Sequence, residues 1–246
     1  MKQSKIISWE RIGEIGILSI SNDKKNYLDQ PDFVDLVELE NWTKEIDLKG
    51  IIIRGIGRNF SAGANTENLQ KLANDQNLLF DKMNKGKQIL DFIENLNIPV
   101  IAAINGACFG GGLEIALACH MRVASKKALL AFPEVNHGLI PGLGGTYRLT
   151  QLLGKKSFEV LLNADLINTT EAIKIGLIDY ISETKDAFDL AKEKLESMIT
   201  DRSIEVIHSA MQAIHNSNKL SKEDALKAET ELFCKLAVNV KIHKQD

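Results

Sequence analysis

Three consecutive glycines, Gly110, Gly111 and Gly112, interrupt a strongly apolar part of this sequence. They follow an apolar run at residues 98–104, which has the length of a buried strand, and they open a second apolar segment whose only charged residue is Glu114. One or two glycines would satisfy a tight turn, whereas three in succession suggest that another group approaches the backbone closely. Since the first N–H groups of a helix lack partners within it, the pattern predicts either a plain turn or an anion-binding helix start.

Two glutamates lie in apolar surroundings after the glycine triplet. Glu114 belongs to the apolar helix, and Glu134 precedes a glycine-rich turn at residues 138–145. A buried, unpaired carboxylate is unfavourable and responds with a raised pKa, which is what a general acid needs near neutral pH. A helix-dipole role for Glu114, or a salt bridge of either glutamate to Arg122 or Arg148, is the structural alternative. Together with exposed N–H groups, the pair suggests acid–base work on an anionic intermediate.

A second loop is a candidate for a further backbone donor. The segment 60–64 follows an apolar strand and contains a glycine, although an ordinary loop explains it too.

Other motifs exclude several kinds of site. Gly142 and Gly144 begin a dinucleotide-binding pattern that fails because Tyr147 stands in place of the third glycine. The histidines lack metal-ligand spacing, and no serine or cysteine lies in a nucleophile-elbow pattern.

The composition is that of a plain soluble protein. The 246 residues are 44% hydrophobic, which is enough for a sizeable core, and the net charge of −3 gives no reason to expect a nucleic acid or membrane partner. No apolar run approaches the roughly 20 residues of a membrane span, and no secretory signal is recognisable. Three cysteines fit no metal-binding spacing and are expected to be reduced. We therefore expect a cytoplasmic protein without a metal.

Strand-like runs alternate with helical patterns, which favours an α/β fold with a largely parallel sheet. Strands are expected at residues 6–9, 15–20, 50–55, 98–104, 121–124 and 128–132. Helices are expected at residues 31–46, 67–96, 111–119, 149–153, 156–162, 170–175, 187–198 and 204–214. Thr169 is the expected N-cap of the 170–175 helix, and Ser221 that of a last helix. The predicted domain division is 1–153, with the site, and 154–246, which is helical.

In this order, the motifs resemble the crotonase family, the enoyl-CoA hydratase/isomerase superfamily. The resemblance spans roughly residues 6–237 and is strongest at 51–64, 98–134 and 138–181. The combination is specific for the family and less specific for the reaction, because the family hosts many. It implies a spiral core of ββα units and a C-terminal helical region used in trimerisation, with a homotrimer or a dimer of trimers as the assembly.

The resemblance also implies roles for individual residues. The main-chain N–H groups of Ala64 and Gly111 would form the oxyanion hole that holds a thioester carbonyl. Glu134 would exchange a proton with the α-carbon, and Glu114 would activate the water that adds at the β-carbon. Further substrate-binding positions are Lys25, Ala62, Gly110 and Gly142. The implied substrate is a coenzyme A thioester, and no cofactor is implied.

Retention of both glutamates favours an enoyl-CoA hydratase, a hydro-lyase of fatty acid metabolism. Asn65 replaces an aspartate usual in the family, His120 replaces an acidic residue, and the turn at 23–27 lacks the usual proline. The chain stops soon after Phe233, which leaves an acyl-carrier-protein thioester open as the partner. The alternatives are an isomerase, a dehydratase or decarboxylase acting on a carrier-bound polyketide intermediate, and a non-catalytic thioester-binding subunit.

Overall fold

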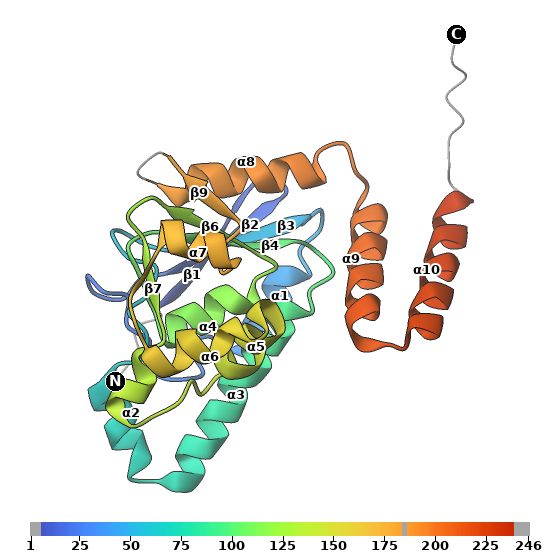
Figure 1. Cartoon of the computed structure of the whole chain (residues 1–246). Helices are drawn as coiled ribbons and strands as arrows, with labels where there is room; N and C mark the ends of the chain where they lie inside the picture. Colours follow the sequence, from blue (N-terminus) through green and yellow to red (C-terminus); the bar gives the residue numbers. More distant parts are fainter. Residues whose placement is uncertain (1–5, 184–185, 239–246) are drawn as a thin grey trace.

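Continuous apolar runs form the central strands of the fold. The computed structural model describes residues 6–183 and 186–238, and its main layer is a six-stranded sheet of order β1-β2-β3-β4-β6-β9 (Figure 1). The strands are β1 (Ile7–Ile12), β2 (Ile15–Ile20), β3 (Gly50–Gly55), β4 (Val100–Ile104), β6 (Met121–Ser125) and β9 (Tyr180–Ser182). Only the β1–β2 pair is antiparallel among these neighbours. The predicted α/β class and largely parallel sheet are confirmed.

The centre of the sheet explains why its strands are mostly apolar. Ile17 of β2 pairs with Ile52 of β3, which pairs with Ile101 of β4, and all three are fully buried. Strands covered on both faces have no solvent side, so they lack the alternation of polar and apolar residues.

A second sheet of three short strands runs beside the first. It has the order β5 (Ala107–Phe109), β7 (Leu129–Ala131) and β8 (Ile167–Asn168). Each of β4 and β6 in the large sheet is followed directly by a strand of the small sheet and then by a helix. An isolated parallel bridge from Ser61 to Cys108 extends the small layer toward the preceding unit. These repeats are the predicted ββα units, and they bring the segments after Ser61, Phe109 and Ala131 to one edge.

Helices cover both faces of the large sheet. The helices in the described part of the chain are α1 (Leu36–Thr43), α2 (Thr66–Ala73), α3 (Gln76–Glu94), α4 (Gly111–Ala118), the 3₁₀ helix η1 (Pro133–His137), α5 (Gly145–Leu153), α6 (Lys156–Asn163), α7 (Thr169–Ile175), α8 (Ala187–Ile199), α9 (Ile204–Lys219) and α10 (Lys222–Ala237). Helix α8 packs on β3, β4 and β6, whereas α3, α4, α5 and α6 gather below the other face (Figure 1). Helices α9 and α10 form a hairpin that projects from this core.

Several predicted boundaries were wrong for local reasons. The region 67–96 is two helices rather than one, because the Asp75 side chain accepts from the Leu78 N–H and starts a new helix. The predicted helix at 31–46 is only α1, with Asp35 as its N-cap. Asn168, rather than Thr169, caps α7, and its side chain accepts from the N–H of Glu171.

The polypeptide after residue 153 is only partly separate from the sheet. Strand β9 joins the large sheet beside β6, and α8 packs on its strands. The division at residue 153 stays a prediction, and the structure adds that the sheet layer continues beyond it. Among the described residues, no helix has both the length and the apolar character needed to cross a bilayer.

Candidate active site

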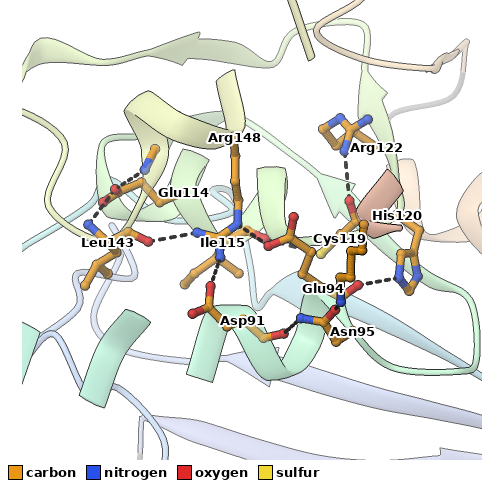
Figure 2. A network of polar contacts seen from close by, with 12 residues as sticks. Asp91, Glu94, Asn95, Glu114, Ile115, Cys119, His120, Arg122, Leu143 and Arg148 are labelled. Atoms are coloured by element: carbon orange, nitrogen blue, oxygen red, sulfur yellow. Dashed lines mark hydrogen bonds and ion pairs between the residues drawn. The ribbon is translucent and has the colours of Figure 1, made fainter. Parts of the chain in front are cut away.

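Glu114 lies in the first turn of α4, two residues after Gly112, the last glycine of the triplet. Its side chain is buried, and Oε1 accepts hydrogen bonds from the N–H of Leu143 at 2.6 Å and of Gly145 at 2.7 Å (Figure 2). Burial raises the pKa of the Glu114 carboxyl, and the two N–H donors oppose that rise because they favour the ionised form. The carboxylate is therefore held in one orientation by the main chain.

The glycine-rich turn supplies these donors because its backbone lies directly against neighbouring side chains. A Cβ atom on Gly145 would lie 2.8 Å from Cγ of Glu114, and one on Gly142 would lie 2.2 Å from Cε of Met83 in α3. Gly144 has φ of +97°, a conformation that favours glycine. The turn thus fits closely between α3 and α4, and Gly142 contacts Met83.

Glu134 lies in η1, a 3₁₀ helix that begins at Pro133. Its Oε1 atom lies against Gly110, because a Cβ added to Gly110 would be 2.7 Å from it. Its buried Oε2 atom has no hydrogen-bond partner in the described part of the chain. Burial, with a smaller contribution from the negative charge of Glu114, raises the pKa of Glu134 to about 7. A buried polar atom without a partner calls for one from a water or a ligand.

Two main-chain N–H groups come together beside these carboxyls. Gly111 is the first residue of α4, and a Cβ on Gly63 would lie 3.5 Å from the Gly111 nitrogen. Ala64 follows Gly63 in a parallel bridge with Leu28, in which the Leu28 N–H binds the Gly63 oxygen and the Asn65 N–H binds the Leu28 oxygen. Within residues 6–183 and 186–238, neither the Ala64 nor the Gly111 N–H donates to another protein group.

A family comparison decides how this arrangement is interpreted. A model of the enoyl-CoA hydratase/isomerase family matches residues 13–245. This chain belongs to that family. It is 35% identical over 224 residues to a probable enoyl-CoA hydratase of Bacillus subtilis (strain 168), covering 89% of this chain and 85% of the relative. It is 32% identical over 232 residues to a short-chain-enoyl-CoA hydratase of Clostridium acetobutylicum, covering 91% and 86%.

Solved structures support the same family. The crystal structure of an enoyl-CoA hydratase from Polaromonas sp. JS666 matches with a TM-score of 0.85 at 25% identity, over 93% of this chain and 90% of that one. An enoyl-CoA hydratase from Thermoplasma volcanium GSS1 matches with a TM-score of 0.82 at 26% identity, over 96% and 94%. The predicted crotonase fold and the prediction of an enoyl-CoA hydratase-like hydro-lyase are confirmed.

Two of the departures from the family pattern, Asn65 and His120, have local structural explanations in this member. Asn65 is the N-cap of α2, and its side chain accepts from the N–H groups of Glu67 and Asn68, which an aspartate at this position would also do. His120 accepts the Val100 N–H at its Nδ1 atom and approaches the Glu94 carbonyl with Nε2. Burial lowers the pKa of His120 to about 4, so a neutral imidazole fills the acceptor position.

The remaining predicted substrate positions, Ala62, Lys25 and Gly110, lie in different surroundings. The Ala62 N–H is already bound to the carbonyl of Lys25, so it is not available as a donor. The Lys25 side chain is exposed, and its Nζ atom contacts the Tyr27 hydroxyl at 3.2 Å. Gly110 lies against Glu134. Their roles in substrate binding stay predictions.

Neither Arg122 nor Arg148 forms the salt bridge to Glu114 or Glu134 that the sequence left open. Arg148 pairs with Asp91 and Glu94 of α3, and Arg122 pairs with Asp179. Sequence reasoning missed that the partners of Glu114 are backbone donors of the glycine-rich turn, although the glycines themselves indicated a close approach.

Among the described residues, no cluster of three or more His, Cys, Asp or Glu is suited to a metal ion.

Proposed function

We propose that this chain catalyses the reversible addition of water to 2-enoyl-CoA thioesters, with Glu114 and Glu134 as its acid–base pair. The observation that carries the proposal is the pair itself: a buried carboxyl, Glu114, held by main-chain donors, and a partly buried one, Glu134, whose Oε2 atom has no partner in the described protein, beside two N–H groups that donate to no described protein group. The relatives named as enoyl-CoA hydratases support it.

In this proposal, the thioester carbonyl oxygen accepts hydrogen bonds from the Ala64 and Gly111 N–H groups. These bonds strengthen as the oxygen takes on negative charge in the enolate, so they stabilise the transition state more than the ground state. The N-terminus of α4 adds a favourable dipole at the same place.

The two glutamates divide the proton transfers. Ionised Glu114 takes a proton from water as the water oxygen bonds to the β-carbon. Protonated Glu134 gives a proton to the α-carbon of the enolate. The products are the 3-hydroxyacyl thioester, a protonated Glu114 and an ionised Glu134. The pair therefore holds one proton before and after the reaction, and a proton returns from Glu114 to Glu134 to complete the cycle. No electron is gained or lost, so the reaction needs no redox cofactor.

We further propose a cytoplasmic homotrimer or dimer of trimers. Apolar side chains exposed on the projecting helix α10, Leu226 and Phe233, are consistent with an assembly that covers them. Light scattering of the purified chain gives the mass that tests the assembly.

The direct test is incubation with crotonyl-CoA while the absorbance of the conjugated thioester is followed. We expect loss of absorbance and formation of 3-hydroxybutyryl-CoA by mass spectrometry. Parallel reactions use a 3-enoyl-CoA and a crotonyl thioester of an acyl carrier protein. Conversion of the 3-enoyl-CoA without hydration of crotonyl-CoA would identify an isomerase, and hydration of the carrier thioester alone would move the substrate class away from coenzyme A.

Replacing Gly110 with alanine tests the placement of Glu134. The new Cβ would lie 2.7 Å from Glu134 Oε1, so the carboxyl must move, and we expect kcat for crotonyl-CoA to fall about 100-fold. Gly154→Ala is the matched control, because Gly154 has nearly the same φ (+54° against +50°) and no atom within 4 Å of the added Cβ. Equal loss of activity in both variants would assign the effect to backbone strain instead.

A further inference from the structure

The guanidinium of Arg148 is buried beneath the glycine-rich turn and binds both the turn and α3. Its Nη1 atom donates to the Leu143 carbonyl at 2.8 Å, and its Nε atom donates to Oε2 of Glu94 at 2.8 Å. Its Nη2 atom donates to Oδ1 of Asp91, one helical turn earlier in α3 (Figure 2). The Arg148 side chain is only 4% exposed.

Leu143 links this ion cluster to the catalytic carboxylate. Its N–H donates to Glu114, and its C=O accepts from Arg148 (Figure 2). The next residue is equally confined, because a Cβ on Gly144 would lie 2.6 Å from Nη1 of Arg148. The backbone from Leu143 to Gly145 is therefore held between a carboxylate on one side and a guanidinium on the other.

Stability alone is a weak reason to bury this guanidinium, because its two carboxylate partners stay largely in solvent: the Asp91 and Glu94 side chains are 63% and 41% exposed. Desolvation of the arginine offsets much of the Coulomb energy of its ion pairs, and apolar replacements of buried ion pairs are often as stable. The planar guanidinium does offer donors in fixed directions, which lets one side chain hold a carbonyl and two carboxylates together. The cluster thus fixes the turn relative to α3 at the point where the turn holds Glu114.

Resting on the proposed function, we propose that Arg148 is a positioning residue for Glu114. It anchors the turn on Asp91 and Glu94, so that the N–H groups of Leu143 and Gly145 keep the carboxylate directed at the attacking water. Its positive charge also lowers the pKa of Glu114, which supports the ionised form that accepts the proton from water.

The test compares Arg148→Lys and Arg148→Gln in the whole 246-residue chain. Lysine keeps the charge but lacks the planar fork, so we expect kcat to fall about 10- to 100-fold with KM changed less than about threefold. Glutamine also removes the charge, so the pKa of Glu114 rises and the acid limb of the kcat/KM profile moves to higher pH. That shift, absent in Arg148→Lys, is an effect that a merely structural role would not produce.

Arg122→Lys is the control, because Arg122 is also buried and also binds backbone carbonyls, those of Cys119 and Leu177, together with the carboxylate of Asp179. We expect it to lower the melting temperature while leaving kcat and the pH profile of the folded enzyme unchanged. The proposal is overturned if Arg148→Lys keeps wild-type kcat, or if Arg122→Lys loses as much kcat as Arg148→Lys.

A spectroscopic titration separates this inference from the proposed function. If wild-type protein hydrates no thioester, the hydratase proposal fails, and ¹³C NMR of the glutamate carboxyls still reports the titration of Glu114. A higher pKa of Glu114 in Arg148→Gln than in wild type and Arg122→Lys supports the Arg148–Glu114 coupling. An unchanged pKa overturns it.

Discussion

Glu134→Gln is expected to lower kcat/KM for crotonyl-CoA by about 10²- to 10⁴-fold, the range typical for loss of a general acid or base. Glutamine has nearly the same shape, but it has no acidic proton to give to the α-carbon. The buried Oε2 atom has no partner in the described protein, so the substitution breaks no protein hydrogen bond there. We therefore expect the melting temperature to change little.

The measurement is steady-state hydration kinetics on protein whose folding is checked by circular dichroism. Solvent exchange at the α-carbon of a saturated acyl-CoA gives a second readout, since it requires proton transfer at that carbon alone. We expect exchange to be lost in Glu134→Gln. A variant that hydrates and exchanges at wild-type rates would remove Glu134 from the mechanism.

The same carboxyl sets the expected pH dependence. Burial and the charge of Glu114 raise the pKa of Glu134 to about 7, and the active pair holds one proton, so the pair loses that proton as the pH rises through about 7. The kcat/KM for hydration should therefore fall above this pH. Because no net proton is consumed, dehydration measured as kcat/KM must show the same profile. A flat profile between pH 6 and 9 would contradict the shared proton.

The sequence pointed to the two candidate carboxyls of the site but not to their contacts. Glu114 and Glu134 were recognisable as candidates because charged residues in apolar segments have few structural explanations. The donors to Glu114 were not, since they lie 29 and 31 residues further along the chain and are backbone atoms that carry no sequence signal. Arg148 was considered as a partner of the glutamates, whereas its carboxylate partners are on α3, which only the tertiary fold reveals.

The fold was predictable where a segment is long and its pattern strong. Strands β2, β3 and β4 are rich in apolar residues, with Ser19 and Arg54 as the polar residues of β2 and β3, and their buried positions in the sheet follow from that. Strand β5 and η1 were missed because three and five residues are too few for a period to show. The break between α2 and α3 was missed as well, because it contains neither glycine nor proline and depends on Asp75 as an N-cap.

Glu114→Gln should lower kcat about 10²- to 10⁴-fold and leave the fold intact. The glutamine carbonyl can still accept from Leu143 and Gly145, so the turn keeps its partner, but an amide cannot take a proton from water. We expect KM to change little, because the proposed thioester contacts are the N–H groups of Ala64 and Gly111. Steady-state kinetics and thermal melting measure both effects.

Glu114→Ala separates the chemical role from the structural one. It leaves two buried N–H groups without an acceptor, each costing about 1–3 kcal/mol, so its melting temperature should fall well below that of Glu114→Gln. Both variants should lose similar catalytic rate per folded molecule. The double variant Glu114→Gln with Glu134→Gln should be little slower than the slower single variant, because both carboxyls serve one water and one shared proton. Fully additive losses would mean that the two glutamates act in independent steps.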